Sequence, residues 1–423
     1  QDHKDKNLLF TGTEFGAYFS TDFGATWNQI KKGLPTIAIR DMEIQEREND
    51  LVLASFGRGF YVLDNYTALR HLTKENLDKQ AHIFPIEKAK LYVESAPLGL
   101  RGVGSQGADL YVAKNPKFGA NFSIYLKDEF KTLKDKRQEE EKKKEKDGED
   151  NDYPSLEELR AERQEEKVQL IWVITDAEGT QIQRLFSSPK KGMQNINWNL
   201  RLPATNPIKL SKRKVGRYSN PETGPLVAPG TYKVQVILQD NGKLTELIKP
   251  TSFEVELLEN QMLANPNQAE NLAFAQELMK LNRKVAGTSS LFGETKERLR
   301  YLKAAIIQSP NADLSLIEEV NELEEIADSI GLKLWGDGLK SSLEMETKPS
   351  IAGRVGTVEY QRYGSTAAPT QTQIDAITIA QEEYAVLRPK IDDYIKRVKV
   401  LQEKLNAAKV PYTKGNSDSF KAE

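Results

Sequence analysis

The fold of the first region is decided by Ser20-Thr21-Asp22-Phe23-Gly24-Ala25-Thr26-Trp27, an octet with the residues of a tight turn between two strands. Gly24 can adopt a positive φ, the Asp22 carboxylate can accept backbone N–H bonds, and Trp27 can place its ring in a core. The strands around the octet are predicted from apolar runs at 8–13, 16–20 and 26–30. The pattern therefore predicts a structural rather than a catalytic role for Asp22.

A second group of strands is predicted directly after the first. The patterns cover 39–44, 51–56 and 60–63, and the turn Gly57-Arg58-Gly59 joins the last two. The six runs amount to about one four-stranded sheet and most of another, and such a sheet cannot bury both of its faces alone. We therefore expect further β-sheets to cover residues 1–66, either from an upstream part of the protein or from another chain. The burial of four side chains should depend on that partner: Leu51, Leu53, Phe60 and Val62.

Two motifs in this region resemble a known family. The octet resembles the Asp box of bacterial-neuraminidase-type repeats, which closes strand pairs in β-propellers of the sialidase and sortilin kind. Residues 53–65, Leu-Ala-Ser-Phe-Gly-Arg-Gly-Phe-Tyr-Val-Leu-Asp-Asn, resemble the last blade of large bacterial sortilin-like repeat proteins, which are often labelled glycosyl hydrolases. That family often has His where Phe56 stands here. The resemblance implies that residues 1–66 are the last blades of an incomplete propeller, a fold that has ~4–8 blades when complete.

The residues of these motifs are expected to be structural. They are Ser20, Asp22, Gly24, Thr26 and Trp27 in the octet, and Gly57, Arg58 and Gly59 in the second turn. Arg58 has two interpretations, bonding to carbonyls of a neighbouring blade or binding an anion, and we favour the first. Glu14, Glu43 and Tyr61 could be assigned as the acid, base and nucleophile of a sialidase-like site, but their spacing gives no support for it. We expect no catalytic residue, no metal site and no cofactor.

A second β region is predicted over 118–258. Its strands are predicted at 121–126, 168–174, 182–186, 195–200, 231–238 and 252–257, with turn residues between them, which is typical of a β-sandwich. The segments VITDAEGTQIQRLF, NINWNL and APGTYKVQVIL resemble the immunoglobulin-like (Ig-like) domain of flagellar hook-capping proteins, a domain that also follows propellers in the sortilin-like family. Trp198 and Tyr232 are interpreted as core residues. Residues 67–117 form a connector, whose glycine-rich part at 98–107 lacks the Gly-Lys-Ser/Thr ending of a phosphate loop.

A charged insertion interrupts the second β region at 127–167. Of its 41 residues 28 are charged, so it cannot enter a core and must be a solvated helical hairpin or disordered. Its middle, Asp147 to Glu158, partly matches a calcium loop. The sixth position is Asp152 where a Gly is required, and Pro154 interrupts the loop. These two departures argue against a calcium site.

Helices are predicted over the last region, 259–415, before a short tail at 416–423. The first begins at an N-cap and N1 pair, Asn265 and Pro266, and extends to about Val285, and the next two cover 290–308 and 314–330. A capping box at 370–373 begins a long final helix, in which a kink is predicted at Pro389. That helix carries an apolar stripe: Ile377, Tyr384, Leu387, Ile391, Tyr394, Val398, Leu401 and Leu405. An antiparallel bundle is the first interpretation of the stripe, and a coiled-coil docking helix is the second. The connection 336–369 is interpreted as an ordered loop or a partner contact.

Composition excludes several classes of function. Sixty Lys and Arg balance 62 Asp and Glu, so no basic field points to nucleic acid. The chain has no Cys, and its three His have no metal-ligand spacing. No apolar run reaches the ~20 residues of a membrane helix. Gln1 is not an initiator Met, and we expect the true start of the protein to lie upstream of it.

The sequence therefore predicts a multidomain protein with the end of a β-propeller, an Ig-like β-sandwich and a C-terminal antiparallel helical bundle. The expected function is non-catalytic binding or scaffolding in an exported bacterial protein, located outside the cytoplasm, as a receptor for peptide or glycan or as part of an envelope complex. One alternative is the accessory half of a glycoside hydrolase whose active site lies on absent blades. Another is an assembly subunit docked through the long helix.

Overall fold

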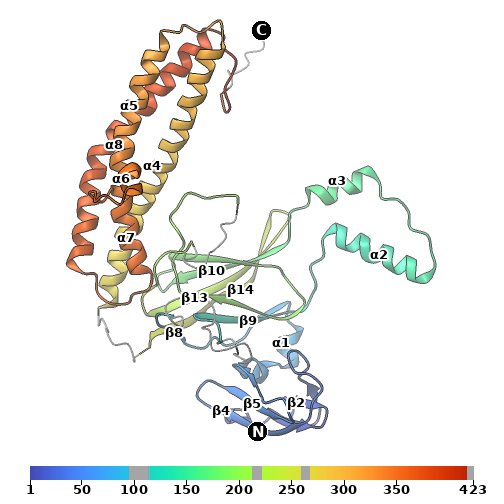
Figure 1. The fold of residues 1–423 in the computed structure, drawn as a ribbon. Coiled ribbons are helices and arrows are strands. Elements are labelled where there is room, and N and C mark those ends of the chain that lie inside the picture. Colours follow the sequence, from blue (N-terminus) through green and yellow to red (C-terminus); the bar gives the residue numbers. More distant parts are fainter. Residues whose placement is uncertain (95–112, 114, 212–221, 259–266, 417–423) are drawn as a thin grey trace. The chain divides into compact units, whose positions relative to one another are not determined.

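The structure is a computed structural model that describes residues 1–94, 113, 115–211, 222–258 and 267–416 (Figure 1). These residues divide into two compact units. The first holds 1–91, 113, 115–200 and 229–258, and the second holds 92–94, 201–211, 222–228 and 267–416. The first unit contains the β-sheets and the second contains the C-terminal helices, so the predicted mixed β and α class is confirmed.

Two three-stranded antiparallel sheets open the first unit. One consists of β1 (Leu9–Thr13), β2 (Gly16–Ser20) and β3 (Asn28–Gln29), and the other of β4 (Ile39–Gln45), β5 (Asp50–Ser55) and β6 (Phe60–Leu63). They share a small core of Leu8, Ala17, Ile39, Leu51, Leu53 and Tyr66. A Cβ added to Gly12 on β1 would lie 2.8 Å from Cγ2 of Ile39 on β4, so the two sheets approach closely because position 12 has no side chain.

The next two sheets form the second β region. They contain β7 (Ala81–Ile83), β8 (Ala89–Leu91), β9 (Ala120–Leu126), β10 (Gln169–Asp176), β11 (Gln181–Ser187), β12 (Gly192–Trp198), β13 (Gly230–Asp240) and β14 (Lys243–Leu257). The larger sheet has the order β11-β10-β13-β14-β8, in which only β14 and β8 pair in parallel, and the smaller has the order β12-β9-β7. Two strands of these sheets, β7 and β8, come from the segment interpreted as a connector. A short 3-10 helix at Tyr66–His71 and α1 (Lys74–Asp78) precede them.

Aromatic side chains join these two sheets. Phe122 on β9 packs against Trp172 on β10 with ring centroids 6.0 Å apart, and Trp198 on β12 packs against Tyr232 on β13 at 5.5 Å. Phe253 on β14 touches both groups. Trp198 and Tyr232 are buried, which confirms their interpretation as core residues.

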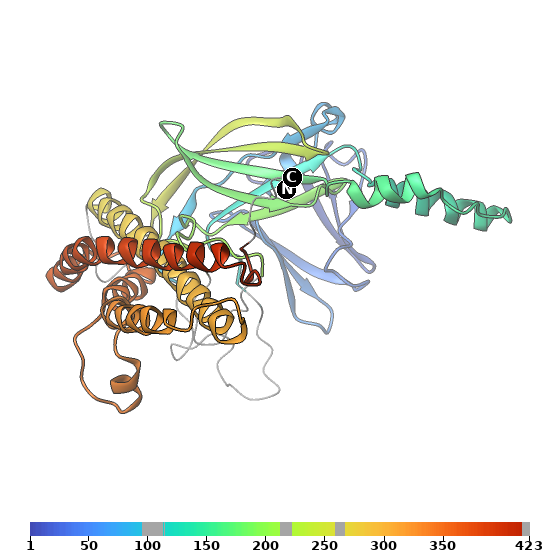
Figure 2. The ribbon, with the colours of Figure 1, turned by 90° about the horizontal axis from the view of Figure 1, so that it is seen from above.

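The charged insertion is a pair of helices without a core. α2 (Leu133–Asp147) and α3 (Leu156–Gln164) follow β9 and precede β10, and neither helix has a buried residue. Each begins with a capping box, at Thr132 and Ser155, and the Arg137 guanidinium on α2 bonds Glu162 on α3. Of the two predicted alternatives, the structure therefore shows the solvated helical hairpin (Figure 2).

The second unit is built on α4 (Gln268–Gln308), α5 (Leu316–Leu334), α7 (Ile351–Tyr363) and α8 (Gln371–Ala407). Polar contacts set their directions. Lys296 bonds Asp328 and Lys303 bonds Glu324, so α5 runs antiparallel to α4, whereas Thr288 bonds Tyr384 and Arg298 bonds Gln402, so α8 runs parallel to α4. Gln361 on α7 bonds Gln373 on α8, and Ile351 lines the same groove as Leu387, so α7 runs antiparallel to α8 and therefore also to α4. The arrangement is a three-helix bundle. Its first and third helices are α4 and α8, and its second helix, here called the middle line, consists of α5 and α7 in succession.

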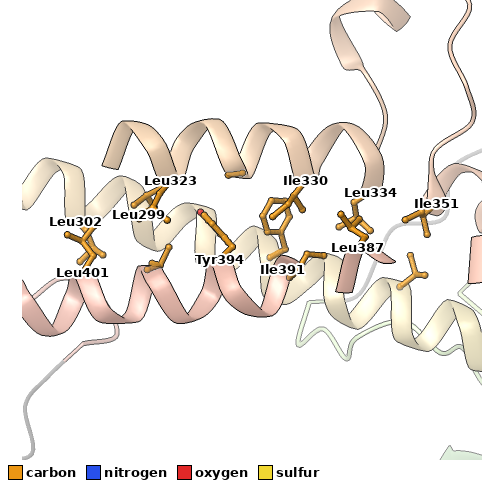
Figure 3. Packing of buried hydrophobic residues seen from close by; sticks show 14 of the residues in the cluster. Leu299, Leu302, Leu323, Ile330, Leu334, Ile351, Leu387, Ile391, Tyr394 and Leu401 are labelled. Carbon is orange, nitrogen blue, oxygen red and sulfur yellow. The ribbon is translucent and has the colours of Figure 1, made fainter. Parts of the chain in front are cut away.

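The bundle has one continuous apolar core (Figure 3). All eight residues of the predicted stripe on α8 belong to it, seven of them buried and Tyr384 partly buried. The stripe is thus used inside the chain, which confirms the bundle interpretation and leaves no free stripe for coiled-coil docking. The capping box at Thr370 is confirmed, and α8 continues through Pro389.

Two predictions about the helical region were wrong, and a third cannot be compared with the structure. The two helices predicted between 265 and 308 are one helix, because Gly287 costs only about 1 kcal/mol in a helix whose neighbours Val285 and Thr288 are buried in the bundle. The N-cap predicted at Asn265–Pro266 lies outside the described residues, and the observed N-cap is Asn267. The connection 336–369 contains α7 and the short α6 (Gly338–Ser342) rather than a loop alone.

The middle line is interrupted only locally. A Cβ added to Gly336, just after α5, would lie 3.6 Å from Cβ of Ser350, the N-cap of α7. The chain therefore leaves the bundle at 336 and returns at almost the same point, and 337–349 form an excursion that includes α6. Among the described helices, none is both long and apolar enough to cross a bilayer.

Candidate functional site

The Asp-box octet forms a turn held by its own side chains. The Asp22 carboxylate accepts from the Thr26 backbone N–H at 2.8 Å, from Thr26 Oγ1 at 2.6 Å and from Ser20 Oγ at 2.7 Å. Ser20 Oγ in turn accepts from the Gly24 N–H at 2.8 Å. The bonds from Thr26, followed by that from Ser20, lower the pKa of Asp22 to about 2. Asp22 is therefore an ionised acceptor that closes the turn, as the sequence predicts.

Trp27 does not enter a core, so that part of the prediction was wrong. The side chain is 43% exposed. Its ring covers the turn instead, because a Cβ added to Gly24 would lie 3.7 Å from Trp27 Cζ2. Gly24 has φ +92°, the positive value that the turn requires.

The second motif is an exposed turn between β5 and β6. Gly57 and Gly59 both have positive φ, at +76° and +72°, and Arg58 between them is exposed. Within the described part of the chain, the Arg58 guanidinium has neither a hydrogen bond nor an ion pair, so its bond to a neighbouring blade stays a prediction. Phe56, before the turn, is exposed and lies under the Arg40 guanidinium, 4.9 Å from the ring centroid.

The residues of the sialidase-like interpretation are not brought together. Met42 pairs with Leu53, and Leu53 pairs with Tyr61, so Tyr61 lies on the inner face of the second sheet. Glu43 pairs with Val52 and lies on the outer face. Glu14 is an exposed residue of the turn between β1 and β2. The described residues therefore form no acid, base and nucleophile constellation at these positions.

The outer face of the sheet β4-β5-β6 is apolar and exposed on β5 and β6, whereas β4 contributes Asp41 and Glu43 to it. Val52 pairs with Val62 and Ala54 pairs with Phe60, which places these four side chains on the same face. Phe60 is 76% exposed and Val62 is 53% exposed. Leu51 and Leu53 point to the opposite face and are buried by the first sheet of the same chain, so the expectation that their burial needs a partner was wrong. For Phe60 and Val62 it stays a prediction. We call Val52, Ala54, Phe60 and Val62 the outer face.

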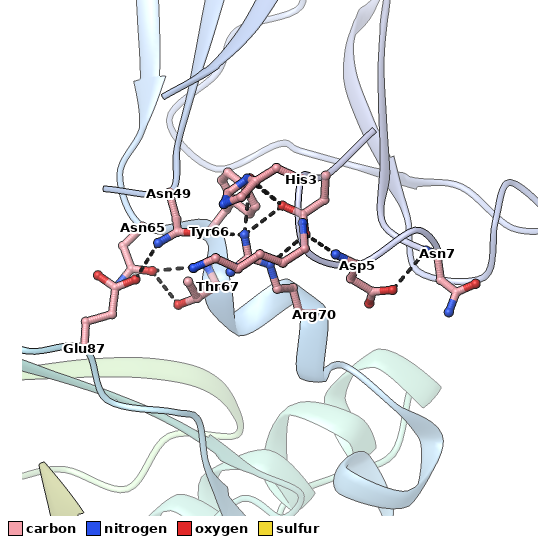
Figure 4. Close-up of polar contacts among 11 residues, drawn as sticks. His3, Asp5, Asn7, Asn49, Asn65, Tyr66, Thr67, Arg70 and Glu87 are labelled. Carbon is pink, nitrogen blue, oxygen red and sulfur yellow. Dashed lines mark hydrogen bonds and ion pairs between the residues drawn. The ribbon is translucent and has the colours of Figure 1, made fainter. Parts of the chain in front are cut away.

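A polar cluster that the sequence analysis missed lies at the other end of this region (Figure 4). The Asp2 side chain is fully buried, and its Oδ2 and Oδ1 accept from Arg70 Nε at 2.8 Å and Nη2 at 2.7 Å. Tyr66 donates its hydroxyl to Asp2 Oδ1 at 2.6 Å, and the Asp5 N–H donates to Oδ2 at 2.7 Å. Arg70 also donates to Asn49 Oδ1 at 2.8 Å. The spacing Tyr66 to Arg70 is one helical turn, but nothing in the sequence connects it to Asp2.

The charges of this cluster are matched to one another. Burial pushes the pKa of Asp2 upward, but the bonds from Arg70, Tyr66 and the Asp5 N–H reverse this and hold the pKa well below its usual range. Burial, together with the bond to Asp2, raises the pKa of Tyr66. Asn49 extends the network by donating to Glu87 at 3.0 Å, and burial raises the pKa of that carboxyl group. Because the carboxylate of Asp2 is saturated with donors, the cluster ties the chain's first turn to the 3-10 helix and is not a site for acid–base chemistry.

Metal binding finds no support in the part of the chain that the structure describes, where no group of three or more His, Asp or Glu side chains could hold an ion. The rejected calcium loop shows why. Glu158 is the reciprocal partner of the Ser155 cap, and Asp152 pairs with Lys144 at 3.2 Å.

Compared with models of protein families and with curated protein sequences, the chain matches none.

Proposed function

We propose that the chain is a non-catalytic binding or scaffolding region of an exported bacterial protein, and that its outer face docks a further β-sheet. In this proposal residues 1–66 are the last blades of an Asp-box propeller, and 118–258 with β7 and β8 form an Ig-like sandwich. The location outside the cytoplasm rests on the resemblance to the sortilin-like family. The covering sheet comes from a preceding part of the same polypeptide or from another chain of an envelope complex.

The observation that carries the proposal is the exposed outer face. Strands β5 and β6 read Leu-Val-Leu-Ala and Phe-Tyr-Val-Leu, so they are apolar on both faces. Strands of this kind occur where both sides of a sheet are covered, and a sheet with one wet face alternates apolar and polar residues instead. The inner face is covered by the sheet β1-β2-β3, and nothing among the described residues packs over Phe60. A second sheet on the outer face would repeat the packing that the chain already has on the inner one.

The unpaired edge of β6 supports the same partner. β6 pairs only with β5 in the described residues and has four residues, so its other edge offers backbone N–H and C=O groups. A β-sheet partner satisfies both needs, because its side chains cover the face and a strand of it can reach the edge. The alternative, an accessory half of a glycoside hydrolase whose active site lies on absent blades, has no comparable observation among the described residues.

The test uses the absence of Cys from the sequence. Val62→Cys creates a unique thiol on the outer face, and Leu244→Cys creates a unique thiol on β14, where Leu244 is also largely exposed. We expect Val62→Cys to react with a thiol-specific dye at the rate of Leu244→Cys in the chain alone. When the chain is produced together with a polypeptide that supplies the proposed covering sheet, Val62→Cys should react at least tenfold more slowly while Leu244→Cys is unchanged. Equal labelling of Val62→Cys with and without that polypeptide, or with any candidate partner chain, would remove the basis of the proposal.

A further inference from the structure

The second unit contains a groove where the middle line of the bundle is interrupted. It has a volume of about 430 Å³ and lies between the end of α5, residues 348–351 and the middle of α8. Its apolar lining consists of Leu332, Pro349, Ile351, Val386 and Leu387. Ile351 and Leu387 also belong to the bundle core (Figure 3). The floor of the groove is therefore formed by core residues that are reached between α5 and α7. The groove is independent of the outer face.

Apolar side chains at the groove are left in water. Val386 on α8 is 66% exposed and Leu332 on α5 is 52% exposed, although both stand next to buried core residues. The excursion passes beside them without covering them. A concave, mostly apolar site of this volume falls in the range of small-molecule pockets, which is about 300–1,000 Å³. The groove is therefore large enough for a small ligand with an apolar body.

The rim of the groove carries an excess of positive charge. Lys333, Lys348 and Lys390 line it, and in the described ranges none of the three has an ion pair. Of the two glutamates in the lining, Glu383 faces Arg354 with 3.8 Å between Nε and Oε2. In the lining, three lysines thus oppose Glu382 and Glu383, which leaves one positive charge in excess, and Arg354 beside Glu383 adds to the same sign from outside the lining. The positive end of the α7 helix, which starts at the groove wall, adds to the same sign.

We propose that this groove binds a small anionic amphiphile, a carboxylate on an unbranched aliphatic chain. The aliphatic chain lies on Val386, Leu387 and Ile351, and the carboxylate lies among the lysines at the rim. Charge favours an anionic head group, because the lining presents three ammonium groups against the two carboxylates of Glu382 and Glu383. The apolar floor selects the tail.

Decanoate is the probe, measured by isothermal titration against the full chain below the concentration at which it forms micelles. We expect saturable binding of one decanoate per chain, weakening about fourfold for each methylene removed in the series decanoate, nonanoate and octanoate. Decyltrimethylammonium and decanol should bind at least tenfold more weakly than decanoate. Non-saturating uptake, or equal binding of decanoate and decyltrimethylammonium, would overturn the proposal.

Matched variants on α8 locate the site. Val386→Ser and Lys390→Glu change exposed side chains in the groove, and Val400→Ser and Lys399→Glu change exposed side chains of the same kinds that do not line it. The first pair should each weaken decanoate binding by about fivefold or more, and the second pair should leave it unchanged within twofold. Equal effects of both pairs would show that decanoate binds elsewhere. A dimer that Val386→Ser dissociates in sedimentation equilibrium would show that a second copy fills the groove, and would also overturn the proposal.

Discussion

Asp2→Asn is expected to loosen the first β region strongly, although it changes one atom of one side chain. The carboxylate of Asp2 accepts from Arg70, Tyr66 and the backbone of Asp5, and the amide can replace only one of its two oxygens as an acceptor. The Arg70 guanidinium, about one-tenth exposed, then keeps its charge without a counter-charge. Removing one partner of a buried ion pair costs about 3–5 kcal/mol. We expect the lower end, about 3 kcal/mol, because Asn preserves the shape and one acceptor.

Hydrogen exchange followed by mass spectrometry measures this loss locally and needs no two-state transition of the whole chain. A loss of about 3 kcal/mol corresponds to about 150-fold faster exchange of protected amides. The amides to follow are those of β1 and Tyr66, whose N–H donates to Asn49 O at 2.9 Å. The control is Asp5→Asn, which changes a half-buried side chain of the same turn whose carboxylate accepts only from the Asn7 N–H in the described contacts. If Asp2→Asn exchanges within a factor of three of the control, the cluster does not anchor this region.

The pH dependence of the same amides provides an internal check. The pKa of Asp2 lies below its unfolded value of about 3.9, so the folded state is the weaker proton binder. The stabilisation from Asp2 is therefore complete above about pH 4 and is lost as the pH falls below that value toward the folded pKa. Protection in β1 should fall with acidification over this range in the wild-type chain. In Asp2→Asn, that part of the pH dependence should be absent.

Three further predictions concern stability. Gly119→Ala should destabilise the second β region by about 3 kcal/mol or more, because a Cβ at φ +110° would lie 2.0 Å from Trp198 O. The control Gly179→Ala, at φ +89° with open space around it, should cost about 1 kcal/mol. Equal melting temperatures of the two variants would contradict this prediction. Replacing 127–167 with a short Gly/Ser linker should leave the melting temperature by calorimetry nearly unchanged, since α2 and α3 bury no residue, and a large fall would mean that they stabilise the sheets. In denaturant titration of the chain alone, Leu53→Ala should lower the free energy of unfolding by about 2–5 kcal/mol, and Val62→Ala should lower it by less than about 0.5 kcal/mol. If Val62→Ala lost as much as Leu53→Ala, the outer face would be covered.

Local chemistry made the turns and the main strands predictable. The octet contains its own donors and acceptors, so the bonds of Asp22 to Thr26 and Ser20 follow from residues within six positions of each other. The stripe on α8 was equally readable because eight apolar residues repeat at helical spacing. Both signals are short-range, and both were correct about the backbone.

The errors came from contacts between distant residues. Trp27 has the large apolar ring typical of a core residue, but whether that ring is buried depends on which sheet lies beside the turn. The helix α7 was missed because Gly353 and Gly356 weaken its helical pattern. The helix is stabilised by the packing of Ile351, Val355 and Val358 against the neighbouring helices, which the sequence alone does not indicate. The cluster of Asp2 and Arg70 joins residues 68 positions apart and has no motif at all.

The excursion at 337–349 offers a place to lengthen the chain. Its two ends meet beside Gly336 and Ser350, so neither α5 nor α7 depends on how far the intervening residues travel. The entropy of closing a loop grows only with the logarithm of its length, and doubling this one costs about 0.6 kcal/mol. An epitope or a folded reporter domain could therefore be inserted near Ser341, in α6, where the side chains are exposed, while the bundle keeps its register. The same tolerance would allow related chains to differ in length at this point without any change in the three lines of helices.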